Sequence, residues 1–236
     1  MNNIQNIPNH VVIIPDGNRR WAREHNIEPW KGHAAGADII EELTKKARDI
    51  GIKYISFWGS SEENMKIRPL KERRELVKIY EKYFNKLIAS DDIFDDDVRI
   101  NVFGKWREQL PKNLVDIIEK GIEKTKNHTK YHLTFFLSYS GDEEMILAIE
   151  KIVKSCKKDI KITKEIIKRN LLTKDLPAVD YLIRTGGEPH LSTGFMMWDI
   201  ANAQLFFADE YFPAFGCEEF EKAIEEYTRR ARRLGA

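Results

Sequence analysis

The sequence has little cysteine, no long apolar run and no excess of charge of either sign. Its two cysteines, Cys156 and Cys217, stand far apart without a CxxC or Cys/His spacing, which argues against a disulfide scaffold or a zinc site. No stretch approaches the roughly 18 apolar residues of a membrane span, and the N-terminus lacks the basic and apolar regions of a signal peptide. These absences predict a cytoplasmic protein.

The charge balance excludes a bulk electrostatic partner. Lysine and arginine number 39 against 38 aspartate and glutamate residues, so nothing indicates nucleic acid and any anion site must be local. The 236 residues are enough to bury a substantial core, and no linker, internal repeat or composition break divides them. We predict a single domain over residues 1–236.

Short apolar runs alternate with segments of helical periodicity. Each run is rich in β-branched or aromatic residues, as strands buried on both faces are. The predicted strands are 10–15, 53–58, 98–104, 131–137, 179–183 and 203–208. The predicted helices are 39–50, ended by Gly51, and 76–88, 114–122, 145–153 and 220–231. About six such units predict an α/β fold with a mostly parallel sheet and helices on both faces.

Polar side chains follow three of the predicted strands at the point where each ends. Residues 16–20 read DGNRR, residues 59–64 read GSSEEN, and residues 184–188 read RTGGE. Ligands of parallel sheets bind beyond the carboxyl ends of the strands, where these segments meet. Arginine forks and glycine backbone N–H groups match phosphate, so the pattern predicts a polyanionic ligand.

Asp16 would repel a phosphate in this basic crevice unless a metal ion lay between them. Mg²⁺ is usually held by one or two carboxylates together with substrate phosphates, which makes Asp16 a candidate magnesium ligand. The residues alone leave a structural ion pair with a neighbouring arginine equally open. The common phosphate-binding motifs do not distinguish these two roles of Asp16, because GxxxxGK[ST] is absent and TGGEPH at 185–190 is not a GxGxxG fingerprint.

Six segments resemble, in order, the motif blocks of the cis-prenyltransferase family, which includes undecaprenyl diphosphate synthase. They are HVVIIPDGNRRWA (10–22), KGHAAGA (31–37), SSEENMKIRP (60–69), YLIRTGGEPHLS (181–192), FMMWDIANAQLFF (195–207) and RRARRLG (229–235). The resemblance implies a Mg²⁺-dependent enzyme that condenses isopentenyl diphosphate with an allylic prenyl diphosphate to give a polyprenyl diphosphate. It also implies a homodimer and a hydrophobic tunnel beside the sheet.

Site residues follow from this resemblance by matching position. Asp16 matches the aspartate that helps Mg²⁺ pull the diphosphate from the allylic substrate, and Asn64 matches a proposed proton-handling residue. The implied substrate-binding residues are Gly17, Asn18, Arg19, Arg20, Trp21, His33, Ser60, Ser61, Glu63, Met65, Arg68, Arg184, His190, Ser192, Arg233 and Gly235. The Arg233-x-Gly235 ending matches one that reaches the active site of the other subunit, and Arg184 with Ser192 matches groups that hold isopentenyl diphosphate.

The chain departs from the family pattern at several positions. Pro29 and His190 stand where arginines are common, and Met65 stands where a tryptophan is usual. Gln204 replaces a glutamate that often helps to hold the metal, so Asp16 is the one carboxylate predicted at the ion and Gln204 stays open. These departures leave transfer to an unusual prenyl acceptor as an alternative function.

The predicted helix 76–88 carries an apolar face wider than one core stripe. Its members are Leu76, Ile79, Tyr80, Tyr83, Phe84, Leu87 and Ile88. Ordinary core packing is one interpretation of this face. The resemblance implies the other, in which the helix walls the tunnel that holds the growing product.

Other interpretations of the same residues compete with this function. A non-catalytic subunit of a two-component prenyltransferase typically lacks the aspartate loop that this chain keeps. A phosphate-ester hydrolase with Asp16 as nucleophile would need a second acid at position 18, which is asparagine. The run DDIFD at 91–95 matches a metal motif of trans-type enzymes, but it stands alone and is interpreted as a solvated turn. A peripheral membrane contact through a lipid product is also left open.

Overall fold

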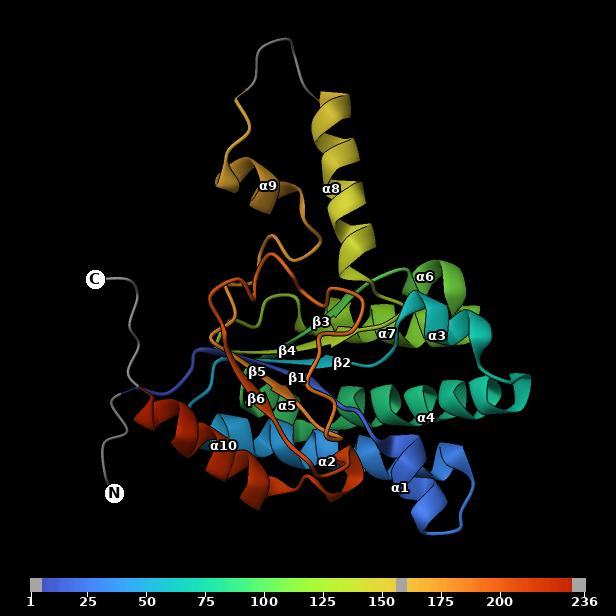
Figure 1. Cartoon of the computed structure of the whole chain (residues 1–236). Coiled ribbons are helices and arrows are strands. Elements are labelled where there is room, and N and C mark those ends of the chain that lie inside the picture. The colour runs from blue at the N-terminus through green and yellow to red at the C-terminus, as the bar shows by residue number, and fades with distance from the viewer. Residues whose placement is uncertain (1–5, 156–160, 231–236) are drawn as a thin grey trace.

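The computed structural model describes residues 6–155 and 161–230 (Figure 1). Its centre is a sheet of six parallel strands in the order β3-β4-β2-β1-β5-β6. The strands are β1 (His10–Ile14), β2 (Tyr54–Trp58), β3 (Val98–Phe103), β4 (Tyr131–Phe136), β5 (Tyr181–Arg184) and β6 (Gln204–Phe207). The predicted fold class is confirmed, and the strand ends differ from the predicted ones by two residues or fewer.

The five predicted helical segments correspond to α2, α4, α7, α8 and α10. The described helices are α1 (Asn18–Glu24), α2 (Pro29–Ile50), α3 (Glu62–Ile67), α4 (Leu70–Ala89), α5 (Asp91–Asp95), α6 (Trp106–Gln109), α7 (Lys112–Thr125), α8 (Gly141–Ser155), α9 (Lys164–Asn170), the 3₁₀ turn η1 (Phe212–Ala214) and α10 (Cys217–Arg229). α2 starts at Pro29, well before the predicted residue 39. The prediction began too late because the first turns of this helix lack an apolar stripe. The predicted turn at 91–95 is instead the short helix α5, with its aspartates exposed.

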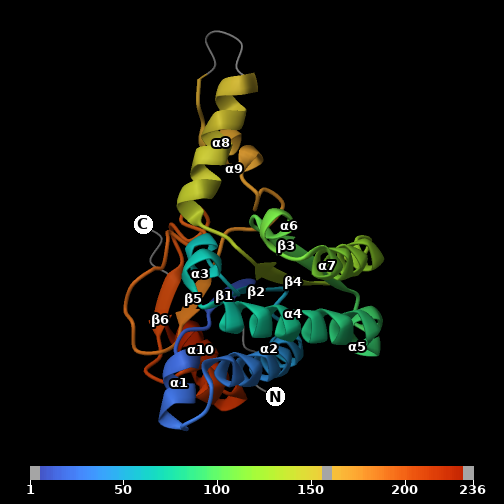
Figure 2. The same cartoon turned by 90° about the vertical axis from the view of Figure 1, so that its right-hand side faces the viewer.

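Both faces of the sheet are buried, which explains the continuous apolar strands. Val11 and Ile13 of β1 belong to one core cluster, and Val12 and Ile14 belong to the other. The first cluster takes side chains from α2, α4, α7 and α10, which lie along one side of the sheet (Figure 2). The second is filled largely by the segments 172–179 and 195–203 that flank β5.

α8 and α9 lie on that second side and project away from the sheet (Figures 1 and 2). The first residue of α8, Gly141, donates its N–H to the Thr193 carbonyl at 2.9 Å. Further along α8, Ile146, Ile149 and Val153 are more than half exposed. Helices thus occupy both sides of the sheet, but α8 leaves an apolar stripe uncovered. No helix within the described ranges is long and apolar enough to cross a bilayer.

The order of the strands opens a crevice between β1 and β5. The chain runs from β1 toward β2 on one side and from β5 toward β6 on the other. Such a switch point separates the loops beyond the carboxyl ends of the strands and leaves room for a ligand. Ile14 and Arg184 are register partners across this pair, so the residues that follow β1 meet those that end β5.

Candidate active site

The loop after β1 holds Asp16 in a fixed position. Gly17 has a φ of 97°, in the left-handed region, and a Cβ there would lie 2.5 Å from the Tyr211 ring. The Gly17 N–H donates to Asp16 Oδ1 at 2.6 Å. The Asp16 carbonyl oxygen accepts hydrogen bonds from Thr185 Oγ1 at 2.8 Å and from the Phe212 N–H at 2.9 Å. The loop is therefore anchored from both neighbouring loops.

The start of α1 packs closely across α2 at two glycines. A Cβ at Gly32 would lie 2.1 Å from the carbonyl oxygen of Asn18, and one at Gly36 would lie 2.4 Å from its Oδ1. The two glycines are four residues apart and share one face of α2. Asn18 is buried there and donates from Nδ2 to the Pro15 carbonyl at 2.8 Å. The segment KGHAAGA thus fixes the helix that carries Arg19 and Arg20.

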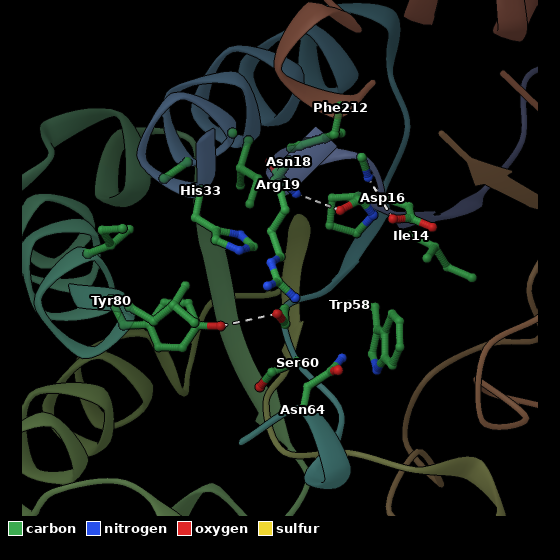
Figure 3. A pocket seen from close by; sticks show the side chains of 18 of the residues that line it. Ile14, Asp16, Asn18, Arg19, His33, Trp58, Ser60, Asn64, Tyr80 and Phe212 are labelled. Atoms are coloured by element: carbon green, nitrogen blue, oxygen red, sulfur yellow. Dashed lines mark hydrogen bonds between the residues drawn. The ribbon is translucent and has the colours of Figure 1, made fainter. Parts of the chain in front are cut away.

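A cavity of about 460 Å³ opens at the crevice (Figure 3). Its polar end is lined by Asp16, Arg19, Arg20, Arg23, His33, Asn64, Arg68, Arg184 and Ser192. Its apolar part is lined by Ala37, Ile40, Leu76, Ile79, Tyr80, Tyr83, Phe84, Phe135 and Leu137. Five arginines face one lining carboxylate, so the polar end is strongly positive. One cavity therefore combines a positively charged end with an apolar channel.

Most of the wide apolar face predicted on 76–88 belongs to this channel. Leu76, Ile79, Tyr80, Tyr83 and Phe84 of α4 line it, whereas the last two residues of that face are buried in the core. The face is thus divided between the cavity lining and the core, and its role as the wall of a product tunnel stays a prediction. The Tyr80 hydroxyl points to the polar end, where it donates to the Gly59 carbonyl at 3.1 Å (Figure 3).

Asp16 makes an ion pair and also faces the cavity. Its Oδ2 accepts a hydrogen bond from Arg184 Nη2 at 2.7 Å, and its Oδ1 lies 3.3 Å from Arg20 Nη2. The Arg184 side chain is 5% exposed and donates from Nη1 to the His190 carbonyl at 2.5 Å. The Asp16 side chain is 33% exposed. The ion pair with arginine is present, and because Asp16 is also partly exposed to the cavity, its role as a magnesium ligand stays a prediction.

A buried acid, Glu72, lies behind the polar end and was missed by sequence reasoning. Its Oε1 lies 3.6 Å from Arg19 Nε, 3.7 Å from His33 Nε2 and 3.7 Å from Arg68 Nε. The His33 imidazole, helped by both arginines, holds the pKa of the Glu72 carboxyl below its ordinary value. Burial lowers the pKa of His33, and Arg68 and Arg19 act in the same direction. The helical spacing of Glu72 from Arg68 was the available signal.

Two further lining residues carry polar groups that the sequence did not single out. Arg23 follows Arg19 and Arg20 by about one turn of α1 and faces the same cavity. Trp58 ends β2, and its buried Nε1–H has no hydrogen-bond partner among the described residues. Helical periodicity could have found Arg23. Nothing in the sequence distinguishes Trp58 from a core residue.

The structure brings most of the predicted site residues together. Those that line the cavity are Asp16, Gly17, Asn18, Arg19, Arg20, His33, Ser60, Asn64, Arg68, Arg184 and Ser192. Arg233 and Gly235 lie outside the described residues. The functional roles of all these residues stay predictions.

Five predicted site residues have side chains that do not line the cavity. Trp21 stacks on the His25 ring at 4.1 Å between centroids, and Glu63 is exposed to solvent. Ser61 caps α3 by accepting from the Asn64 N–H at 2.9 Å. Met65 is packed in the core, and His190 turns its side chain to solvent while its carbonyl holds Arg184. Ser61 and Met65 thus serve local structure here.

Gln204 is distant from Asp16 within the chain. It begins β6 level with Tyr181, whereas Arg184, the partner of Asp16, is level with the last residue of β6. Asp16 and Gln204 therefore do not meet at one ion within a single chain. Among the described residues, no three histidine, cysteine, aspartate or glutamate side chains gather as a metal site. Asp16 together with ligand phosphate oxygens is a donor set that fits Mg²⁺.

Comparisons with known proteins agree with this geometry. A family model described as undecaprenyl diphosphate synthase matches residues 14–235. The tritrans,polycis-undecaprenyl-diphosphate synthase (geranylgeranyl-diphosphate specific) of Pyrococcus horikoshii is 38% identical over 233 residues, covering 97% of this chain and 87% of that protein. An isoprenyl transferase of Listeria monocytogenes is 37% identical over 233 residues, covering 97% and 90%.

A solved structure is similar over nearly its whole length. It is lavandulyl diphosphate synthase from Lavandula x intermedia in complex with dimethylallyl diphosphate. The two chains are 27% identical with a TM-score of 0.89, and the match covers 98% of this chain and 99% of the other.

Proposed function

The chain belongs to the undecaprenyl diphosphate synthase family of prenyltransferases, and from this premise we propose that it condenses isopentenyl diphosphate with an allylic prenyl diphosphate, lengthening a cis-prenyl chain. The observation that carries the proposal is one cavity that is cationic at one end and apolar along the rest. A prenyl diphosphate has the same division. The related structure that holds dimethylallyl diphosphate supports an allylic substrate in this cavity.

The arginines supply the electrostatic part of the reaction. As the bond between the allylic carbon and its diphosphate breaks, negative charge develops on the leaving oxygen, and guanidinium groups already in place stabilise it. Arg184, which the family resemblance assigns to the diphosphate of isopentenyl diphosphate, is oriented by the His190 carbonyl. Arg20 is oriented by Glu188, at 3.2 Å, and by the Tyr211 ring beneath it. Little reorganisation of these side chains is then needed during the reaction.

The proposal includes Mg²⁺ at Asp16. When bound, this ion would neutralise diphosphate charge and make the diphosphate a better leaving group. Asp16 is suited to hold it, because its carboxylate is partly exposed to the cavity and is fixed by Gly17 and Arg184. The nearby guanidinium groups would then contact the remaining phosphate oxygens.

The new carbon–carbon bond forms when the double bond of isopentenyl diphosphate attacks the electron-poor allylic carbon. A proton then leaves the former isopentenyl unit. Asn64 and Ser192 line the same cavity, and these two residues and the departing diphosphate are the candidates to handle the proton. The apolar channel beyond them excludes water from the reactive carbon and holds the hydrocarbon chain.

We extend the proposal to a homodimer. β6 is the last strand of the sheet, and Leu205 and Phe207 on it are more than one third exposed. The uncovered stripe of α8 adds Ile146, Ile149 and Val153. Exposed apolar groups on an edge strand and a projecting helix are typical of a surface covered by another chain. Light scattering of the purified protein tests this, and a monomer at micromolar concentration would contradict it.

The decisive experiment uses the purified chain alone. Labelled isopentenyl diphosphate is incubated with Mg²⁺ and a panel of allylic diphosphates, from dimethylallyl to geranylgeranyl, and the product lengths are measured. We expect incorporation with at least one starter. No incorporation with any starter would reject the proposed function, and incorporation that needs a second protein would indicate a subunit of a two-component enzyme.

A further inference from the structure

Glu72 is buried at a point where three elements of the cavity wall meet. Arg19 comes from α1, His33 from α2, and Arg68 from the end of α3. Each places a side-chain nitrogen 3.6–3.7 Å from the same oxygen, Glu72 Oε1, while the Glu72 side chain is 4% exposed. Burying a carboxylate costs free energy unless other groups pair with its charge. The three cavity-lining side chains around Glu72 provide that pairing.

The contacts of Glu72 are longer than close hydrogen bonds, and those with Arg19 and Arg68 are ion pairs. Its Oε1 has no hydrogen-bond partner among the described residues, and Arg68 Nη1 and His33 Nε2 are likewise buried without one. These nitrogens therefore keep donor capacity for a ligand in the cavity that all three residues line. Glu72 attracts the arginines by charge and the neutral His33 ring through its N–H dipole, and it leaves their close hydrogen bonds to a ligand.

Arg19 depends most on this contact. Its side chain is 52% exposed, and Glu72 is its ion-pair partner in the described part of the chain. A long, exposed arginine side chain with no fixed partner samples many rotamers, and ordering it on a ligand costs entropy. Glu72 removes part of that cost before the ligand binds.

The cluster lies at the head of the apolar channel. His33 precedes the channel residue Ala37 by one turn of α2, and Glu72 precedes Leu76 by one turn of α4. A diphosphate held by this cluster has its hydrocarbon beside those residues. Arg184 and Ser192, by contrast, come from the segment around β5. The two groups of anion-binding side chains are therefore built on different elements.

We propose that Glu72 is a positioning residue for the diphosphate of the substrate whose hydrocarbon occupies the channel, the allylic substrate. It acts by holding Arg19, Arg68 and His33 in the arrangement that this diphosphate meets. The inference rests on the proposed function and adds a residue that contacts no substrate. If Glu72 acted only as a negative charge near the diphosphate, it would repel the ligand, and removing its charge would tighten diphosphate binding.

The test compares Glu72→Gln with Glu75→Gln, a matched change on the same helix at a residue paired with Lys78 at 2.8 Å on the surface. Calorimetry measures binding of geranylgeranyl diphosphate with Mg²⁺ and without isopentenyl diphosphate, so no turnover occurs. We expect Glu72→Gln to weaken binding about 10-fold, equivalent to about 1.4 kcal/mol. Unchanged or tighter binding would overturn the proposal, and Glu75→Gln should match the wild type.

Steady-state kinetics separate positioning from a merely structural role. In Glu72→Gln, the KM for the allylic substrate should rise about 10-fold, while the KM for isopentenyl diphosphate changes less than about twofold. Equal rises in both KM values would contradict the assignment. If Glu72→Gln does not fold, Glu72→Asp, which retains the charge but shortens the side chain, should give the same selective change.

A double-mutant cycle with Arg68→Gln tests whether Glu72 acts through the arginine. Adding Glu72→Gln to Arg68→Gln should weaken allylic binding by less than about threefold, because part of the arrangement is already lost. A full 10-fold additional loss would overturn the mechanism. Wild-type protein that binds and elongates no allylic substrate would instead reject the proposed function itself.

Discussion

Asp16 and Arg184 join the ends of two strands that are more than 160 residues apart in the sequence, through a hydrogen bond of 2.7 Å. The contact follows from the sheet, because Ile14 and Arg184 are register partners and Asp16 stands two residues beyond Ile14. Arg184 is nearly buried, so an acid beside it lowers the cost of keeping a guanidinium at the base of the crevice.

The exchange Asp16→Asn removes the charge of Asp16 and keeps its size. Asparagine keeps one oxygen, which can accept from either Arg184 or the Gly17 N–H, so one of the two hydrogen bonds is lost at a small cost in stability and the fold should be retained. Loss of the negative charge removes the proposed Mg²⁺ ligand, and we expect turnover to fall about 100- to 1,000-fold. Circular dichroism and the incorporation assay measure the two effects. A folded variant with wild-type turnover would contradict the role of Asp16.

Tyr83 stands between the channel and a second, smaller cavity. It lines the main cavity and also one of about 110 Å³ between α2, α4 and α5. Its ring meets Phe84 and Phe135 edge to face, at 6.2 and 5.7 Å between centroids. We therefore expect this aromatic ring to limit the space that a growing hydrocarbon can fill.

Removing this ring should lengthen the product. Tyr83→Ala joins the two cavities, so we expect products longer than those of the wild type by one or more five-carbon units. Tyr83→Phe keeps the ring and should leave the distribution unchanged. The truncation should also cost about 3 kcal/mol of unfolding free energy, so stability is measured beside chain length. An unchanged distribution in a folded Tyr83→Ala protein would show that another residue ends the channel.

The sheet and half of the site could be predicted because they depend on local patterns. Buried parallel strands are short and apolar, and they stand out against amphipathic helices. Once the strands were placed, the rule for carboxyl ends brought Asp16 and Arg184 to one crevice. The Gly17 turn and the arginines beside it needed no tertiary knowledge.

Other features depend on contacts that a pattern does not contain. Glu72 looks like any solvated acid in a charged helix start, and its burial results from the packing of α1, α2 and α3 around it. Ser61 and Met65 lie in a motif block, yet Ser61 caps α3 and Met65 packs in the core, and their order in the sequence does not reveal this. The distance of Gln204 from Asp16 is set by strand register, which similarity to a motif block does not contain.

Gly32 provides a test of how α1 is held. A methyl group there would meet the Asn18 carbonyl oxygen at 2.1 Å, and a backbone atom cannot rotate away as a side chain can. Gly32→Ala should therefore displace α1 and cost about 1–3 kcal/mol of unfolding free energy. Because α1 carries Arg19 and Arg20, binding of allylic diphosphate should weaken as well. Urea unfolding and calorimetry measure the two effects.

Gly36→Ala serves as the comparison for this prediction. Its added methyl group would meet the Asn18 side-chain oxygen at 2.4 Å, which can move by rotation. We expect a smaller loss of stability than in Gly32→Ala. Equal stability of Gly32→Ala and the wild type would indicate that α1 and α2 can separate without cost.

His10 should make the stability of the protein depend on pH in a narrow window. It is fully buried at the start of β1, with Nδ1 3.0 Å from the Pro177 carbonyl oxygen and Nε2 2.9 Å from Ser56 Oγ. Nδ1–H then donates to the carbonyl, and Nε2 accepts from the hydroxyl. Burial lowers the pKa of His10 from 6.5 to about 4, so the folded protein keeps the neutral ring where the unfolded chain binds a proton.

The sign of the effect follows from this difference in proton binding. The contribution of His10 is fully present above pH 6.5 and is lost as the pH falls toward 4, by about 1.4 kcal/mol for each pH unit. Urea unfolding between pH 6.5 and 5 should show a loss of about 2 kcal/mol from this residue. The pKa of His33 is lowered as well and adds to the slope. His10→Gln cannot titrate there, so its slope should be clearly shallower. An identical slope in that variant would mean that His10 is not the group that binds the proton on unfolding.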